Sequence, residues 1–269
     1  MIKHRYLPMT ESDQKEMLEA IGVSSIDELF EDIPESVRFK GEYKIKPAKS
    51  ESALLKELSQ LAAKNKDSKT YTSFLGAGVY DHYVPVIVDH VLSRSEFYTA
   101  YTPYQPEISQ GELQAIFEFQ TMICELTGMD VANSSMYDGG TALGEATTLA
   151  CGSTRRKKIL ISAAVHPEYK DVVKSYAKGQ YIEVIEIPQK DGVTNLDALK
   201  EQMNDEVAGV IVQYPNFFGR IEALDEIEKI AHQDKGMFIV CSNPLALGVL
   251  TPPGEFGADI VAGDAQPFG

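Results

Sequence analysis

The chain has 269 residues and carries 25 Lys+Arg against 40 Asp+Glu, a formal net charge of −15. This length predicts one large domain or two small ones, with enough chain to bury a sizeable core. The acidity argues against a general nucleic-acid binder, because phosphate contacts need clustered cations. The one dense basic run, residues 155–158, precedes a strand-like segment, and we interpret it as a solvated loop rather than a phosphate-binding patch.

Cysteine usage and hydropathy indicate the compartment. The three cysteines stand far apart, so they cannot build a disulfide framework and fit a reducing environment. The N-terminus has no apolar run of signal-peptide length, and no stretch approaches the roughly 20 apolar residues that a transmembrane helix needs. The sequence therefore predicts a soluble cytoplasmic protein. The cysteines are Cys124, Cys151 and Cys241.

Residues 1–70 are predicted to form a helical N-terminal arm. Thr10 is a plausible N-cap ahead of Glu11, and leucines between residues 54 and 61 recur at the spacing of an amphipathic helix. Such helices would either pack on the main domain or bind a partner, and we expect the first. The leucines are Leu54, Leu55, Leu58 and Leu61.

Residues 71–269 are predicted to form an α/β large domain with a mostly parallel sheet flanked by helices. A strong helix with a wide apolar face spans 110–127 and ends at Gly128. Beyond Gly140, strand-like and helix-like segments alternate, which indicates α/β crossovers. We expect strands at 159–161, 182–187, 207–212, 237–241 and 259–261, and helices at 141–150, 167–177, after Asn195 and at 224–232.

The C-terminal end stops directly after the last predicted strand, at residues 262–269. An open sheet covered on both faces normally needs more chain there. We therefore expect the large domain to be truncated at its C-terminus.

Metal and nucleotide motifs have little support in this sequence. The five histidines never fall at ligand spacing with one another, and neither CxxC nor HExxH occurs, so we expect no metal. Gly76-Ala77-Gly78 is only a fragment of a dinucleotide fingerprint, and a tight turn explains it better. The histidines are His4, His82, His90, His166 and His232.

Asp138-Gly139-Gly140-Thr141 leads into a predicted helix and has two equally weighted interpretations. Backbone N–H groups at a glycine-rich helix N-terminus can converge on an anion such as phosphate. Alternatively, this is an ordinary glycine turn in which Asp138 caps the helix. The carboxylate of Asp138 would itself repel a phosphate, which weakens the first interpretation.

A tyrosine-rich loop, residues 98–107, is the densest cluster of amphipathic side chains. Its prolines stiffen the backbone, and its tyrosines combine flat area with a hydroxyl, as binding sites and interfaces require. A purely structural loop that packs on its own domain remains the competing explanation.

Several long blocks resemble one known family, the P-protein (glycine decarboxylase) of the glycine cleavage system. The blocks are residues 101–113 (YTPYQPEISQGEL), 119–128 (FQTMICELTG), 136–142 (MYDGGTA), 166–168 (HPE), 213–219 (QYPNFFG), 242–245 (SNPL) and 263–269 (GDAQPFG). Residues 5–10 (RYLPMT) are similar to the opening of subunit 1 of the bacterial two-subunit form. That subunit resembles the N-terminal half of the single-chain enzyme.

The resemblance implies a pyridoxal phosphate enzyme of fold type I and the family's reaction. In that reaction glycine is decarboxylated, and its aminomethyl group passes to the lipoyl arm of H-protein. The implied partners are subunit 2, in a heterotetramer, and lipoylated H-protein. As alternatives, the chain would be a non-catalytic scaffold that stabilises subunit 2, or a stand-alone pyridoxal phosphate lyase or aminotransferase.

The chain departs from a self-sufficient cofactor site. The resemblance implies a Schiff-base lysine after a late strand, but the last lysine is Lys235, and Gln266 stands at the comparable place. An acid is expected to end the strand at residues 238–241, where Cys241 stands instead. We therefore expect subunit 2 to hold pyridoxal phosphate, and this chain alone to be inactive. The turn at Gly139, Gly140 and Thr141 would be the relic of a phosphate cup.

Enzymes of this fold generally place their pockets at a dimer interface, so a subunit without cofactor can complete its partner's site. The tyrosine-rich loop supplies our candidate residues across that interface. Its backbone is stiffened by prolines, and its side chains end in hydrogen-bonding groups. The candidates are Tyr98, Tyr101, Thr102, Tyr104, Gln105 and Glu107.

Overall fold

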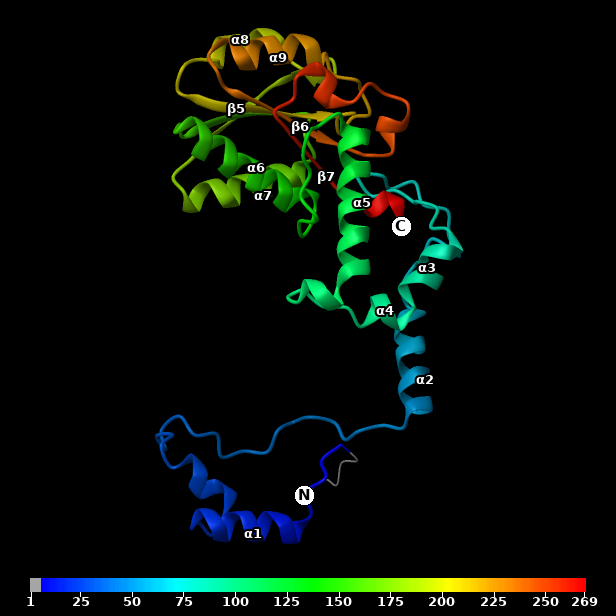
Figure 1. Ribbon diagram of the computed structural model, residues 1–269, viewed down its shortest axis with the longest axis vertical. Helices are drawn as coiled ribbons and strands as arrows, with labels where there is room; N and C mark the ends of the chain where they lie inside the picture. Colours follow the sequence, from blue (N-terminus) through cyan, green and yellow to red (C-terminus); the bar gives the residue numbers. More distant parts are fainter. Residues whose placement is uncertain (1–5) are drawn as a thin grey trace. The chain divides into compact units, whose positions relative to one another are not determined.

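The computed structural model describes residues 6–269 and divides into two units, with the boundary between Thr72 and Ser73. The first unit contains α1 (Glu11–Ile21), the 3-10 helix η1 (Ile26–Phe30) and α2 (Glu51–Ala62) (Figure 1). Thr10 caps α1 as predicted, because its side chain accepts a hydrogen bond from the Asp13 N–H at 3.2 Å. No described residue from 6 to 72 is buried. That this unit is an arm packing on the large domain stays a prediction.

The second unit begins with short helices before its sheet. The segment rich in glycine and tyrosine leads into α3 and α4, and the tyrosine-rich loop then ends in the 3-10 helix η2. No helix among residues 6–269 is long and apolar enough to cross a membrane. These helices are α3 (Val86–Leu92), α4 (Ser95–Tyr98) and η2 (Pro106–Ile108), followed by α5 (Gln110–Thr127).

A parallel sheet forms the centre of the second unit, in the order β2-β1-β5-β6-β7 within the described residues. Helical connections join its strands, as the alternating sequence pattern predicts. A two-stranded hairpin, β3 (Gln189–Lys190) with β4 (Val193–Thr194), was not predicted. The sheet strands are β1 (Lys158–Ser162), β2 (Glu183–Ile187), β5 (Val207–Tyr214), β6 (Met237–Ser242) and β7 (Ile260–Gly263).

Helices cover both faces of this sheet, so alternate strand residues enter two separate cores. Ile159 and Ile161 pack with α6 (Gly139–Thr154) and α7 (Pro167–Gly179), whereas Leu160 packs with α8 (Leu196–Gln202) and α9 (Leu224–Gln233). Figure 1 shows these two helix pairs on opposite sides of the strands. Because successive side chains of a strand point to opposite faces, the continuous apolar runs of β1, β5 and β6 fit a sheet buried on both sides.

The basic run at 155–158 is only partly the solvated loop that the sequence predicts. The Arg156 guanidinium donates to the carbonyl oxygens of Val207 and Asp234, at 2.7 and 2.8 Å. The Lys158 ammonium binds the Glu206 carboxylate at 2.7 Å. Two of the four cations therefore tie together strand ends that meet at the amino edge of the sheet.

Helix α5 spans the predicted residues and ends where Gly128 adopts a left-handed φ of 71°. Its C-terminal end is close to the loop before β7, because a Cβ atom on Gly254 would lie 2.1 Å from the Gly128 carbonyl oxygen. Within α5, which the structure describes in full, Thr127 alone is buried. Of the predicted apolar face, Phe117 is 67% exposed, whereas Leu113, Ile116, Phe119, Ile123 and Leu126 are partly buried.

A histidine between two carboxylates joins α9 to the start of β7. His232 Nδ1 lies 2.6 Å from Glu228 Oε1, and His232 Nε2 lies 2.8 Å from Asp259 Oδ2. The same Asp259 oxygen accepts the Phe238 N–H at 2.7 Å. Partial burial lowers the pKa of His232, but the hydrogen bonds to Asp259 and Glu228 outweigh it, so the net pKa is raised.

This raised pKa makes the contribution of His232 to stability pH-dependent. A group with a raised pKa in the folded state stabilises fully below its unfolded value of 6.5 and loses that effect as the pH rises through the folded value. We expect His232→Gln to cost roughly 1 kcal/mol in free energy of unfolding at low pH and less at alkaline pH. Denaturant unfolding across this range measures the difference, and a cost independent of pH would contradict it.

Candidate functional site at the carboxyl edge of the sheet

The carboxyl ends of the parallel strands meet the N-terminus of α6 at one edge of the sheet. Ligands of open α/β sheets bind at this edge. An open pocket of about 740 Å³ lies there between α6, β6 and β7, and its lining includes Ser134, Asp138, Ser242, Asp264 and Gln266. Among residues 6–269, no group of three His, Cys, Asp or Glu side chains is arranged to hold a metal ion.

Carboxylates occupy the N-terminus of α6. Asp138 Oδ1 accepts the Thr141 N–H at 2.7 Å, and Thr141 Oγ1 accepts the Asp138 N–H at 3.1 Å, which together form a capping box. The Gly139 N–H donates to Asp264 Oδ2 at 3.4 Å. Of the two interpretations of this turn, the structure therefore forms the glycine turn capped by Asp138. The N–H groups of Gly139 and Thr141, which an anion would use, already have carboxylate partners.

The aromatic ring of Tyr169 fills the space against this glycine turn. A Cβ atom on Gly139 would lie 2.7 Å from Tyr169 Oη, and one on Gly140 would lie 3.2 Å from Tyr169 Cδ1. The glycines are thus required by the close approach of a side chain from α7. Burial, together with nearby Cys241 and Asp264, raises the pKa of Tyr169 to about 12. The phenol stays neutral at physiological pH.

Cys241 lies near the end of β6 and is buried. Burial, with a smaller effect from Asp264, raises the pKa of its thiol to about 12. The side chain is therefore a neutral thiol at physiological pH. It cannot supply the negative charge expected at this position from the sequence resemblance.

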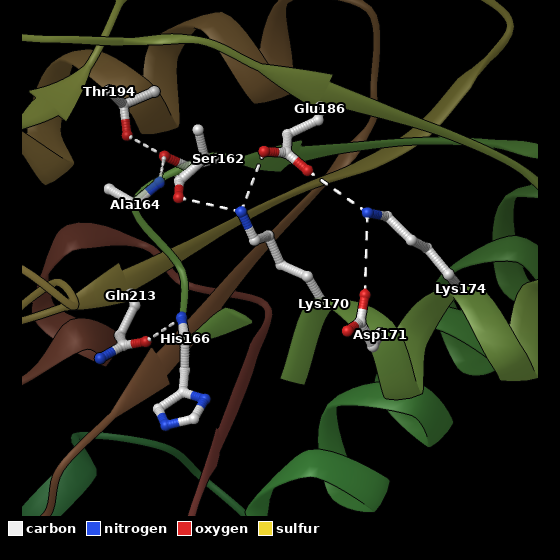
Figure 2. A network of polar contacts seen from close by, with 10 residues as sticks. Ser162, Ala164, His166, Lys170, Asp171, Lys174, Glu186, Thr194 and Gln213 are labelled. Carbon is white, nitrogen blue, oxygen red and sulfur yellow. Dashed lines mark hydrogen bonds and ion pairs between the residues drawn. The ribbon is translucent and has the colours of Figure 1, made fainter. Parts of the chain in front are cut away.

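Neither Lys170 nor Lys235 offers a free Schiff-base lysine at this edge. Lys170 follows Tyr169 on α7, and its ammonium donates to the Ala163 carbonyl at 3.1 Å and to Glu186 Oε1 at 2.9 Å (Figure 2). The hydrogen bond and charge of Lys170, with a smaller effect from Lys174, outweigh burial and lower the pKa of Glu186, which keeps the ion pair charged. Lys235 precedes β6 and therefore lies at the opposite, amino edge of the sheet.

Gln266 lies beside the glycine turn, in the short 3-10 helix η5 (Gln266–Phe268). Its side chain lines the same pocket, and its backbone N–H donates to Asp264 Oδ1 at 2.9 Å. Asp264 thus holds Gly139 with one carboxylate oxygen and Gln266 with the other. The structure brings Gln266 together with Gly139, Gly140 and Thr141.

The tyrosine-rich loop lies elsewhere, at the N-terminal end of α5 (Figure 1). Tyr98, Tyr101 and Tyr104 are 80%, 77% and 76% exposed. The rings of Tyr101 and Tyr104 are 6.1 Å apart, and the Tyr104 N–H donates to the Thr102 carbonyl at 2.8 Å. None of residues 98–107 lines the pocket at the carboxyl edge of the sheet. The chain does not bring the loop and the glycine turn together.

Three residues of the carboxyl edge had no role in the sequence interpretation. Tyr169 and Asp264 contact the glycine turn, and His166 stacks on Tyr169 with 4.8 Å between ring centroids. His166 and Asp264 lie in sequence blocks that resemble the family, and this was the only signal available. Their contacts with residues far away in the chain carry no local pattern.

A parallel sheet covered by helices on both faces, with a glycine turn at its carboxyl edge, is the architecture of pyridoxal phosphate enzymes of fold type I. The family model described as "Glycine cleavage system P-protein" matches residues 4–269. The chain belongs to this family.

The relatives named "Probable glycine dehydrogenase (decarboxylating) subunit 1" are similar along almost the whole chain. The protein of Anoxybacillus flavithermus is 77% identical over 266 residues, which cover 99% of this chain and 59% of the relative. That of Bacillus cytotoxicus is 78% identical over 266 residues, which cover 99% and 60%. The chain therefore spans about three fifths of the length of the curated relatives it matches.

Two solved structures place the fold. An inhibitor-bound crystal structure of glycine decarboxylase (P-protein) of the glycine cleavage system is 43% identical, with a TM-score of 0.87, covering 98% of this chain and 59% of that chain. A C-DES variant with glycine covalently linked to its PLP cofactor is 17% identical, with a TM-score of 0.51, covering 68% and 50%. At that identity the likeness concerns the fold alone.

The residues at this edge do not fit pyridoxal phosphate. Phosphate would meet the carboxylates of Asp138 and Asp264 at the N-terminus of α6, where a dianion needs free N–H donors. Tyr169 fills the space against the turn, and Cys241 brings no charge to a pyridinium nitrogen. A Schiff base also needs a lysine, and residues 236–269 contain none.

This lack of fit predicts the outcome of a labelling experiment. We expect the purified chain, mixed with pyridoxal phosphate and reduced with borohydride, to yield no lysine adduct of defined stoichiometry. Peptide mass spectrometry measures the adducts, and the exposed lysines of residues 6–72 report random modification. A single stoichiometric adduct on one lysine of residues 73–269 would overturn the expectation.

Proposed function

We propose that this chain acts as subunit 1 of a glycine dehydrogenase (aminomethyl-transferring, decarboxylating). With a second subunit it would decarboxylate glycine and transfer the aminomethyl group to the lipoyl arm of H-protein. The observation that carries the proposal is the match to the P-protein family from residue 4 to residue 269, at 77% identity to a relative named as that subunit.

In this proposal the second subunit, rather than this chain, holds pyridoxal phosphate. That cofactor supplies an electron sink for decarboxylation, so the protein contributes binding, orientation and electrostatics. Support comes from the carboxyl edge described above, where Asp138 and Asp264 bind the N–H groups of Thr141 and Gly139. The glycine turn at Gly139, Gly140 and Thr141 is then the remnant of a phosphate cup, and Gln266 stands where a lysine would be needed.

The proposal is tested by glycine–bicarbonate exchange with lipoylated H-protein. Full-length subunit 1, subunit 2 and their mixture are assayed separately at equal concentrations. We expect activity only in the mixture, because neither subunit alone would have both the cofactor and the completing surface. Activity in subunit 1 alone would refute the assignment. Full activity in subunit 2 alone would make this chain a scaffold.

Within the complex, the tyrosine-rich loop is proposed to complete the cofactor or substrate site of the second subunit. Its three tyrosine rings are exposed, and none of its residues lines the pocket at the carboxyl edge of its own sheet. A neutral phenol can donate a hydrogen bond to a phosphate or carboxylate without adding charge. The proposed residues are Tyr98, Tyr101, Thr102, Tyr104, Gln105 and Glu107.

Removing single hydroxyls tests this role. We expect Tyr101→Phe or Tyr104→Phe, in full-length subunit 1 mixed with subunit 2, to lower exchange by roughly 10²–10³ fold if the lost donor acts at the reacting centre. Size-exclusion chromatography is expected to show unchanged assembly, because the aromatic ring is retained. Tyr181→Phe, at an exposed tyrosine outside the loop, is the matched control. If neither loop variant changes turnover, the loop is structural.

A further inference from the structure

A tight turn in the glycine-rich segment contacts a histidine at the carboxyl edge of the sheet. The turn is formed by Gly76, Ala77, Gly78 and Val79, and the Val79 N–H donates to the Gly76 carbonyl at 3.3 Å. Its central residues, Ala77 and Gly78, have φ angles of 59° and 86°. Positive φ at both central positions defines a type I′ turn, which projects a narrow backbone tip.

The tip of this turn lies against the imidazole of His166. A Cβ atom on Gly78 would be 2.2 Å from His166 Nε2 and 2.5 Å from Cδ2, a distance that no side chain can occupy. Only glycine allows the backbone to approach this ring. At Gly76, by contrast, a Cβ atom would meet nothing nearer than the Tyr80 ring at 4.0 Å.

Contacts from three elements hold the His166 ring rigidly in place. Its backbone N–H donates to Gln213 Oε1 at 2.7 Å (Figure 2), and its Nδ1 accepts the Glu168 N–H at 3.2 Å. The ring stacks at 4.8 Å on Tyr169 and meets the edge of Phe217 at 5.1 Å. Since Nδ1 is an acceptor, the neutral ring carries its proton on Nε2, the atom that faces Gly78.

The segment held by this contact has few other anchors. None of the described residues from 73 to 110 is buried. Besides the His166 contact, Gly269 lies close to α3, where a Cβ atom on it would be 3.1 Å from Val88 Cγ2. Because the segment runs from the turn through α3 and α4 directly into the tyrosine-rich loop, the position of the turn constrains the start of that loop.

We propose that His166 is a positioning residue. Its imidazole contacts the turn at residues 76–79 and holds that turn in place, which fixes the position of the segment that leads into the tyrosine-rich loop. The part of this inference that concerns catalysis rests on the proposed function, whereas the contact that holds the turn against His166 does not. His166 acts through the backbone of Gly78.

Limited proteolysis of the full-length chain tests whether the contact with His166 holds the turn in place. Gly78→Ala places a methyl group on the His166 ring, whereas Gly76→Ala imposes similar backbone strain without a clash, so it is the matched control. We expect chymotrypsin to cleave after Tyr80 and Tyr83 roughly 5–30 times faster in Gly78→Ala than in Gly76→Ala. Cleavage after Tyr43 in the first unit is the internal reference and is expected to be unchanged.

A double substitution then assigns the effect to His166. His166→Asn keeps an N-cap acceptor for α7 but removes the ring. If both residues form one contact, Gly78→Ala adds little to the cleavage rate of His166→Asn, whereas independent sites would give additive effects. Equal cleavage of Gly76→Ala and Gly78→Ala, or additivity in the double variant, overturns the proposal.

Kinetics of the assembled complex separate positioning from stability. We expect Gly78→Ala to lower kcat for exchange at saturating subunit 2, while the melting temperature stays at that of Gly76→Ala. A merely structural contact would lower the melting temperature and leave kcat unchanged. If the wild-type mixture has no exchange activity, the proposed function is wrong. The proteolysis result still decides whether His166 holds the turn in place.

Discussion

Burial of the parallel sheet on both faces is the constraint from which the rest of the α/β unit follows. Ile159 and Leu160 are adjacent in β1 yet belong to different cores, one under α6 and α7 and the other under α8 and α9. Parallel strands joined by such helices direct all their carboxyl ends to the same edge. That edge therefore gathers the glycine turn of α6 with the residues that follow β1, β6 and β7.

The chemistry at this edge favours helix stability over anion binding. The positive end of the α6 dipole is matched by the carboxylates of Asp138 and Asp264, an interaction typically worth about 0.3–1 kcal/mol for each charge near a helix N-terminus. The same carboxylates would repel a phosphate. A chain organised in this way is suited to supporting a site in a second subunit, which is the role we propose for it.

Several large apolar side chains outside the sheet are exposed. Phe117 and Met122 on α5 are exposed, and no described residue of the first unit is buried. Short helices such as α1 and α2 gain little stability on their own in water, so their apolar faces need a neighbouring surface. The second subunit that we propose would offer such a surface. The contact between Gly78 and His166 would then order the segment that leads into the tyrosine-rich loop before the second subunit binds.

Local pattern was enough to predict most elements, because periodicity and turn residues act over a few positions, whereas the family was indicated by the long sequence blocks that resemble it. The helix at 110–127 ends at Gly128 as expected, and the strand predicted at 237–241 is β6. The glycine turn at Asp138 was also located from sequence, although two interpretations of it remained open.

The tertiary structure alone showed which groups cap and surround the turn. Asp264 reaches Gly139 from 125 residues away, and Tyr169 fills the space against the same turn from another helix. The sequence also predicted an apolar face on α5, and the fold buries most of that face only partly and leaves Phe117 exposed. An apolar stripe along a helix indicates that burial of that face is energetically favourable. Whether it is buried depends on which distant segments pack there, and that is a property of the folded chain.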